Sequence, residues 1–139
     1  MAAPAFARDI MSQPVMTLSR DASVLDAAKF LLDNRLSGAP VLDDRGRVAG
    51  VFTFRDLAKF FLEPALEDAS APRPDPAKAK VSELMTKHAE SVRPGDRIED
   101  CRKLMRQHRM HRVLVTDDEG ALVGIISATD LVFRVHEGV

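Results

Sequence analysis

Two short segments carry residue types suited to binding an anion or a ligand with hydroxyl groups. They are Gly50-Val51-Phe52-Thr53-Phe54-Arg55-Asp56 and Gly124-Ile125-Ile126-Ser127-Ala128-Thr129-Asp130, and each lies where a predicted strand leads into a predicted helix. A helix N-terminus presents free N–H groups that attract anions, and a carboxylate there can accept both hydrogen bonds of a ribose diol. Thr or Ser followed three residues later by an acid is also a capping box, which needs no ligand. Both interpretations stay open at this point.

Both segments belong to an internal repeat. Residues 9–57 align with residues 83–131 without a gap. Identical residues recur in pairs, which include Met11 and Met85, Asp26 and Asp100, Gly46 and Gly120, Gly50 and Gly124, and Asp56 and Asp130. Because one register explains all these pairs, we interpret the chain as two copies of one unit.

Residues 63–80, EPALEDASAPRPDPAKAK, separate the two copies. They hold four of the eight prolines and many Ala and Asp residues, which is typical of a linker that is semi-rigid where proline-rich. A connection of this length is either disordered or functional, and its composition favours a tolerated insertion. We therefore expect repeat 1 over residues 1–62, the linker over residues 63–80 and repeat 2 over residues 81–139.

The hydrophobic pattern predicts a β-α-β-β-α unit in each copy. A short extended segment comes first, and apolar residues at helical spacing follow from Val24 and from Ile98. Two strands then join through an Asp-Asp-x-Gly turn, and a closing helix begins near Arg55 or Thr129. The paired strands are expected over residues 39–42 and 48–52, and over residues 113–116 and 122–126. One unit cannot cover both faces of its sheet, so we expect an α/β (α+β) fold in which the two repeats pack sheet to sheet.

Polar side chains also mark where the first helix of each copy begins. Ser23 with Asp26, and Asp96 with Glu99, have the spacing of a capping box. These pairs predict helices that begin directly after Ser23 and Asp96.

The order and doubling of these motifs resembles a tandem pair of CBS domains, also called a Bateman module. The residues that carry the resemblance are Asp9-Ile10-Met11 leading to Thr17, residues 37–43 and residues 50–56, and in the second copy Glu83-Leu84-Met85, residues 111–117 and residues 124–130. The resemblance implies a non-catalytic regulatory module that needs no cofactor and signals to a partner protein. It also implies binding of adenosine-containing ligands (AMP, ADP, ATP or S-adenosylmethionine) in clefts between the repeats.

The resemblance further implies which residues bind the nucleotide. Thr53 and Asp56 would hold the ribose in one half-site, and Ser127 and Asp130 in the other. The base pockets would be lined near Thr17, Ala39 and Pro40, and near Ser91, Val113 and Leu114; Arg55 and Thr129, inside the motifs, are further candidates. An apolar lining suits adenine without aromatic stacking, which fits a chain with no Trp and no Tyr.

By the same resemblance, His111 and Arg112 reach the phosphate of the ligand whose ribose is held by Asp56. An arginine fork binds phosphate bidentately. The equivalent positions in the first copy, Ser37 and Gly38, carry no charge. We therefore expect unequal sites, with a nucleotide at Asp56 and a nucleoside-like ligand or nothing at Asp130, although Ser37 remains a candidate contact.

Other binding chemistries find less support in the sequence. His108 and His111 lack an evident third ligand, so we expect no metal site. Arg102, Arg106 and Arg109 form a basic stripe at helical spacing, but a net charge of −1 favours a solvated face over nucleic-acid binding.

Composition also bears on catalysis and on location. The one cysteine, Cys101, falls on a predicted core face, and no nucleophile with a placed base is evident, so we expect no enzyme. A single cysteine forms no internal disulfide, which suits a reducing compartment. The start of the chain does not read as a secretory signal, and no apolar run approaches a membrane span. We expect a cytoplasmic protein with no membrane association.

The closing helices are apolar around more of their circumference than one core face needs. This pattern predicts a homodimer whose interface contains Leu57, Phe60, Phe61, Leu131, Val132 and Val135. Deeper packing within the chain is the alternative. For function, the rival interpretation is a ligand-free interaction or scaffold protein in which both capping boxes serve as caps only.

Overall fold

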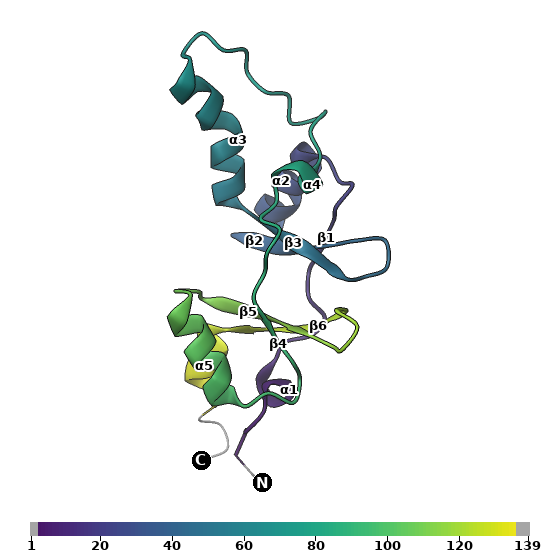
Figure 1. The fold of residues 1–139 in the computed structure, drawn as a ribbon, viewed down its shortest axis with the longest axis vertical. Coiled ribbons are helices and arrows are strands. Elements are labelled where there is room, and N and C mark those ends of the chain that lie inside the picture. Colours follow the sequence, from purple (N-terminus) through teal and green to yellow (C-terminus); the bar gives the residue numbers. More distant parts are fainter. Residues whose placement is uncertain (1–2, 136–139) are drawn as a thin grey trace. The chain divides into compact units, whose positions relative to one another are not determined.

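The computed structural model describes residues 3–135 and divides into two compact units. The Asp56 unit comprises residues 16–89, and the Asp130 unit comprises residues 1–15 together with residues 90–139. The Asp56 unit contains β1 (Leu18–Ser19), α2 (Val24–Asp33), β2 (Gly38–Leu42), β3 (Val48–Thr53), α3 (Phe54–Glu67) and α4 (Val81–Leu84) (Figure 1). The Asp130 unit contains α1 (Ala7–Ile10), β4 (Ser91–Val92), α5 (Ile98–Gln107), β5 (Arg112–Thr116), β6 (Leu122–Ser127) and α6 (Ala128–Phe133).

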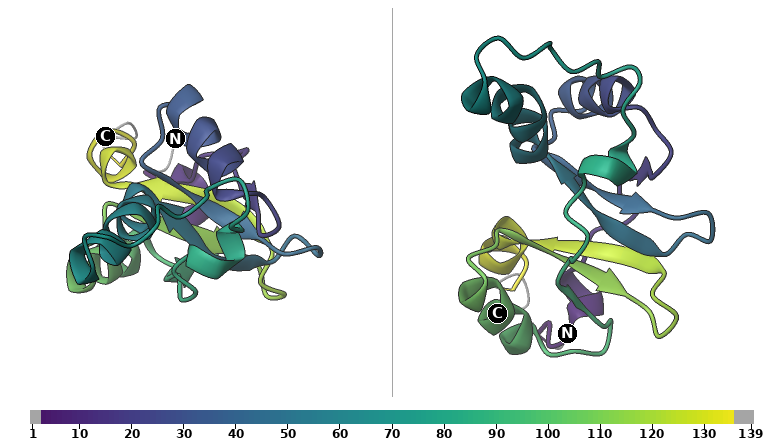
Figure 2. Two further views of the ribbon diagram at one scale, coloured as in Figure 1. Left: turned by 90° about the horizontal axis from the view of Figure 1, so that it is seen from above. Right: turned by 45° about the horizontal axis from the view of Figure 1, so that its top comes forward.

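Each unit is built around one three-stranded sheet, in the order β1-β2-β3 or β4-β5-β6. The first pair in each sheet is parallel and the second is antiparallel. Within its own unit, α2 lies beside α3 on one face of the sheet, and α5 and α6 likewise cover one face of theirs (Figures 1 and 2). The predicted α/β class and the repeated β-α-β-β-α order are therefore confirmed.

The hairpin turns form where the Asp-Asp-x-Gly pattern predicts them. Gly46 and Gly120 have φ angles of 78° and 83°, a left-handed conformation that glycine adopts at little cost. Asp43 stabilises its turn because its Oδ1 accepts the N–H groups of Arg45 and Arg47. The two strands of each hairpin start and end within one residue of their predicted bounds.

The predicted caps of the first helices differ in outcome. Ser23 is the N-cap of α2, and its Oγ accepts the N–H of Asp26 at 3.0 Å. The cap predicted at Asp96 is wrong, because α5 begins one residue later, with Arg97 at the N-cap and no side-chain cap. Asp96 instead stabilises the preceding turn, where its Oδ2 accepts the N–H of Arg93 at 2.8 Å.

The segment between the repeats contains more regular structure than its composition predicts. Helix α3 continues to Glu67 and includes Pro64, so it runs into the range expected to be linker. At the other end of the segment, Val24 donates to the carbonyl of Ala79 and Leu25 to that of Pro76, both at 2.9 Å. The first N–H groups of a helix have no partner inside the helix. The end of this segment therefore satisfies two donors of α2.

Each unit has its own hydrophobic core. Each core includes residues of the short helix that begins the other sequence repeat. The core of the Asp56 unit includes Val81 of α4, and that of the Asp130 unit includes Ala7 and Ile10 of α1. Residues 7–10 thus pack with the second repeat, and residues 81–84 with the first. The boundaries of the two compact units therefore differ from those of the two sequence repeats, which the linker separates.

Cys101 lies fully buried in the core of the Asp130 unit, as its position on the helix predicts. Burial, helped by the nearby Asp96 and Asp100, raises the pKa of its thiol to about 11. The thiol is therefore protonated at neutral pH and is not a nucleophile. Across residues 3–135, the structure contains no helix with the length and hydrophobicity needed to cross a bilayer.

Candidate functional site

Thr53 and Asp56 meet at the point where β3 leads into α3. Thr53 is the N-cap residue, and its Oγ1 accepts the N–H of Asp56 at 3.4 Å. In return, Asp56 Oδ2 accepts the N–H of Thr53 at 2.9 Å and its hydroxyl at 3.2 Å. The capping box is therefore complete, and it fixes the carboxylate through Oδ2 at the start of the helix.

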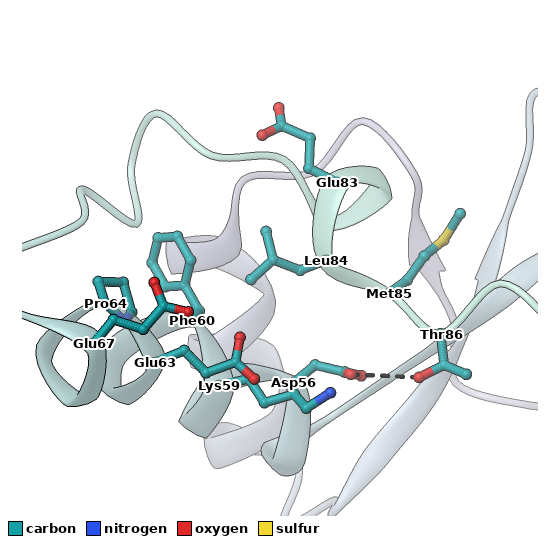
Figure 3. Close-up of a pocket in the computed structure, with 10 residues that line it drawn as sticks. All are labelled: Asp56, Lys59, Phe60, Glu63, Pro64, Glu67, Glu83, Leu84, Met85 and Thr86. Atoms are coloured by element: carbon teal, nitrogen blue, oxygen red, sulfur yellow. Dashed lines mark hydrogen bonds between the residues drawn. The ribbon is translucent and has the colours of Figure 1, made fainter.

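The second oxygen of Asp56 has a different and weaker partner. Asp56 Oδ1 accepts the hydroxyl of Thr86 at 3.4 Å, near the limit of a hydrogen bond (Figure 3). Asp56 is 7% exposed. Such a carboxylate oxygen retains acceptor capacity, and a hydroxyl group of a ligand can use it.

Thr86 reaches Asp56 because the chain after α4 pairs with β3. Val51 and Thr86 exchange two backbone hydrogen bonds, each 2.9 Å long. Gly50 permits this approach, since a Cβ at that position would lie 2.4 Å from the carbonyl oxygen of Thr86. Thr86 directly follows the Glu83-Leu84-Met85 motif, but neither its residue type nor its spacing marks it as a site residue in the sequence.

A cleft of about 540 Å³ opens beside Asp56, between α3 and residues 83–86 (Figure 3). Helix α3 supplies one wall and the segment from α4 onward supplies the other. The lining residues are Asp56, Lys59, Phe60, Glu63, Pro64, Glu67, Glu83, Leu84, Met85 and Thr86. Part of the wall comes from the α3 extension that the sequence assigned to the linker.

Ser127 and Asp130 form the same capping box at the start of α6. Ser127 Oγ accepts the N–H of Asp130 at 3.0 Å, and Asp130 Oδ2 accepts the N–H of Ser127 at 2.8 Å. Here, however, Oδ1 forms an ion pair with Nε of Arg134 at 3.3 Å. The two predicted half-sites therefore share a cap and differ in the partner of the outer carboxylate oxygen.

The residues predicted to line the base pockets divide between the two faces of each sheet. Side chains alternate along a strand, so neighbours point to opposite faces. Ala39 and Val113 belong to the hydrophobic cores. Because their side chains pack in the cores, a contact of these two residues with a ligand would come from their backbone, and their place in the base pockets stays a prediction. Pro40 and Leu114 follow them on the strands and face the other way.

The remaining candidates are distributed over both units. In the Asp56 unit, Thr17 is half-buried and Arg55 is exposed, and the carbonyl of Ser37 accepts the N–H of Phe54 at 3.0 Å. In the Asp130 unit, Thr129 is exposed, while Ser91 Oγ accepts the hydroxyl of Thr116 at 3.3 Å.

His111 and Arg112 lie at the start of β5. Both are exposed, and the carbonyl of His111 accepts the N–H of Ala128 at 2.7 Å, which places His111 next to the start of α6. Their predicted role toward the ligand of Asp56 joins residues of the two units, and it stays a prediction.

The closing helices present fewer apolar side chains to solvent than their composition predicts. Leu57 and Leu131 are buried in the cores, and Phe60 and Val135 pack against them. The exposed members of the predicted interface are Phe61 and Val132, and Leu62 and Phe133 are exposed beside them.

The basic stripe and the histidines show contacts typical of a solvated surface. Arg102 pairs with Glu99 at 3.3 Å, and His108 lies 3.7 Å from Glu90. Within residues 3–135, the structure brings together no group of three His, Cys, Asp or Glu side chains able to hold a metal ion.

Two sheets of identical topology, each with a carboxylate in a capping box at its strand-to-helix junction, define a tandem repeat of one α/β unit. Comparison with protein families matches the CBS domain twice, over residues 7–63 and 81–137. The chain therefore belongs to the CBS domain family, with two copies in tandem.

Individual relatives agree with this assignment. An uncharacterized protein of Methanocaldococcus jannaschii is 29% identical over 90% of this chain and 88% of its own length. The inosine-5'-monophosphate dehydrogenase of the same organism is 30% identical over 92% of this chain, but the chain spans only 23% of that enzyme. That similarity is limited to a minor part of the enzyme.

Two solved structures show what similar CBS pairs bind. CBSX2 in complex with AMP has a TM-score of 0.74 and 26% identity, covering 91% of this chain and 93% of its own. The CBS domain pair of protein MJ0100, in complex with 5'-methylthioadenosine and S-adenosyl-L-methionine, has a TM-score of 0.71 and 26% identity, with coverages of 91% and 92%. Both similar proteins hold adenosine-containing ligands.

Proposed function

We propose that this protein is a non-catalytic sensor that binds an adenosine-containing ligand, with the ribose hydroxyls on the carboxylate of Asp56. The observation that supports this most strongly is the state of that carboxylate. It is held through Oδ2 by the capping box, while Oδ1 accepts a long hydrogen bond from the hydroxyl of Thr86, at 3.4 Å, beside a cleft of about 540 Å³. The ligands of CBSX2 and MJ0100 give the ligand class.

In this proposal the capping box and the ligand do not compete. Oδ2 keeps its bond to the N–H of Thr53 and fixes the carboxylate. A ribose hydroxyl approaches Oδ1 and displaces or joins the hydroxyl of Thr86. Hydrogen bonds to an ionised acceptor are about twice as strong as neutral ones. The ribose hydroxyl groups therefore bind more strongly to a carboxylate than to a neutral acceptor.

The test is ligand-dependent thermal unfolding of the wild type and of Asp56→Asn, with AMP, ADP, ATP and S-adenosylmethionine as separate probes. A ligand at 100 times its Kd stabilises a protein by about 2.7 kcal/mol, which raises the Tm of a chain of this size by about 8 °C. Asn keeps an oxygen for the cap but loses the charge. We expect the Tm shift to disappear in Asp56→Asn.

Asp44→Asn is the matched control, since Asp44 lies in the hairpin turn after β2 of the same unit. It changes the net charge equally and should retain the full Tm shift. If Asp56→Asn binds as tightly as the wild type, Asp56 does not hold the ribose. If none of the four probes shifts the wild type, the ligand-free scaffold becomes the better interpretation, and the two complete capping boxes already fit it.

We further propose that the sensor acts as a homodimer and signals to a partner protein. The support for the dimer is the large apolar side chains that remain exposed on the closing helices, including Phe61 at 44% and Val132 at 59%. Such groups favour burial against a second copy. Light scattering at micromolar concentration tests this, and a mass near 15.3 kDa would contradict it.

A further inference from the structure

The two capping-box carboxylates differ in the partner of the outer oxygen. At Asp56, Oδ1 accepts a neutral hydroxyl from Thr86 at 3.4 Å. At Asp130, Oδ1 faces the guanidinium of Arg134 at 3.3 Å, one helical turn further along the chain. The oxygen that a ribose would need is thus paired with a full positive charge in the Asp130 unit only.

Arg134 is held at more than one point. Its Nη1 donates to the carbonyls of Ile10 at 3.3 Å and Met11 at 3.5 Å, at the C-terminal end of α1. Carbonyls at a helix C-terminus lack partners inside the helix and favour a cation. The guanidinium therefore bridges α6 and α1, and displacing it from Asp130 breaks an arrangement with three acceptors.

The position of Arg134 corresponds to that of Phe60 in the Asp56 unit, since each lies one turn after the acid. Phe60 packs against the core and lines the cleft. A phenyl ring donates no hydrogen bond to a carboxylate. The residue type at this one position thus decides whether the outer carboxylate oxygen is free to accept from a ligand.

We propose that Arg134 acts as an internal occupant of the Asp130 half-site and limits the chain to one ribose-containing ligand, held at Asp56. This inference rests on the proposed function. A guanidinium offers a charged donor to Asp130, whereas a ribose offers only neutral hydroxyls, so the internal partner prevails. The reason is distinct from the missing charges at Ser37 and Gly38, because it applies equally to a ligand without phosphate.

The test is the stoichiometry of binding to the full chain, measured by titration calorimetry with AMP and, separately, with adenosine. The wild type should bind one equivalent. Arg134→Phe, which imports the residue of the other unit, should bind two, and Arg134→Phe combined with Asp56→Asn should bind one. The reciprocal change Phe60→Arg should reduce the one equivalent of the wild type to none, or weaken it at least tenfold. Leu66→Arg is the matched control, because it adds the same charge to the same helix at a residue that is 81% exposed, and it should still bind one.

The outcomes separate this inference from the proposed function. Two equivalents on the wild type, or one on both Arg134→Phe and Phe60→Arg, overturn the role of Arg134 and leave ligand binding intact. No binding to the wild type or to Arg134→Phe overturns the proposed function itself. Arg134→Gln, which keeps polar contacts but loses the charge, provides the same test if thermal unfolding shows that Arg134→Phe does not fold.

Discussion

The Asp56 unit and the Asp130 unit have the same sheet topology and the same capping box, yet they differ in what lies beyond the box. Helix α3 extends over 14 residues, and α6 over 6. The longer helix supplies one wall of a cleft beside Asp56. The shorter helix is followed directly by Arg134, which pairs with Asp130.

This difference shows that the capping box and the surroundings of its outer carboxylate oxygen are set by separate parts of the sequence. A Thr or Ser with an acid three residues later is sufficient to start the helix in both units. In our proposal, ligand binding depends in addition on the residue one turn later and on the segment that pairs with the preceding strand. When one of these two features is changed in one unit, the other unit therefore serves as the control.

The largest expected effect is a loss of stability that tests whether α1 packs in the Asp130 unit. Ile10 is fully buried in the Asp130 unit although it belongs to the first repeat in the sequence. Ile10→Ala should destabilise that unit by about 2–5 kcal/mol, the usual cost of truncating a buried aliphatic side chain. In native-state hydrogen exchange, amides of β5 and β6 should exchange faster, and those of β2 and β3 should change much less.

Leu84→Ala is the counterpart in α4. Leu84 is half-buried against the core of the Asp56 unit, so its truncation should cost less and accelerate exchange in β2 and β3 instead. Faster exchange in β2 and β3 after Ile10→Ala would show that the assignment of α1 to the Asp130 unit is incorrect.

The next effect concerns the two glycines that precede the capping boxes. A Cβ at Gly50 would lie 2.4 Å from a backbone oxygen, that of Thr86, whereas a Cβ at Gly124 would lie 2.6 Å from the Sδ of Met11. Backbone yields less readily than a flexible methionine. We expect Gly50→Ala to cost about 1–3 kcal/mol by overpacking, and Gly124→Ala to cost less.

Urea denaturation of the two variants measures this difference. Gly50→Ala should also weaken AMP binding, because the carbonyl that must move belongs to the residue whose hydroxyl reaches Asp56. Equal losses of stability in the two variants would mean that Thr86 adjusts as easily as Met11.

A smaller effect is expected at the caps themselves. Thr53 and Ser127 each accept an N–H of the following helix. Replacement by Ala should cost about 1 kcal/mol in either unit, the usual value for a lost N-cap. Thermal unfolding checks the values, and a loss at Thr53 well above that at Ser127 would indicate a further role for the Thr53 hydroxyl in the folded Asp56 unit.

Much of this fold is predictable because its signals are local. Runs of apolar residues and the glycines at 46 and 120 predict the hairpin strands and their turns within one residue. Thr53 and Ser127 specify where the closing helices begin. These features depend on neighbours in the sequence, which a single chain displays directly.

The features that distinguish the two units depend on contacts between distant parts of the chain. Thr86 reaches Asp56 because it pairs with Val51 of β3, and Arg134 is held by the carbonyls of Ile10 and Met11 at the end of α1. Neither Thr86 nor Arg134 stands out by residue type or spacing. The composition of residues 63–80 likewise concealed that α3 continues to Glu67, since Pro64 is normally unfavourable inside a helix.

The smallest expected effect is on acid stability, where one aspartate from each unit can be compared. Hydrogen bonds from the N–H groups of Arg47 and Arg45 lower the pKa of Asp43 below its usual 3.8, and those from Phe6 and Ala5 lower the pKa of Asp9 in the same way. A carboxylate with a lowered pKa in the folded state contributes stability above its unfolded pKa. That contribution is lost as the pH falls through the folded pKa. NMR titration of both side chains should give midpoints below 3.8.

Asp43→Asn and Asp9→Asn should each reduce stability slightly at pH 7 and match the wild type at the acid end of the titration. Both carboxylates are exposed, so the losses of stability should be small. Added salt should reduce a loss that comes from the charge of the carboxylate, but not one that comes from its hydrogen bonds. A midpoint at or above 3.8 for one aspartate would show that its hydrogen bonds are absent in solution. Because Asp43 lies in a hairpin and Asp9 in α1, such a result would identify which unit departs from the structure.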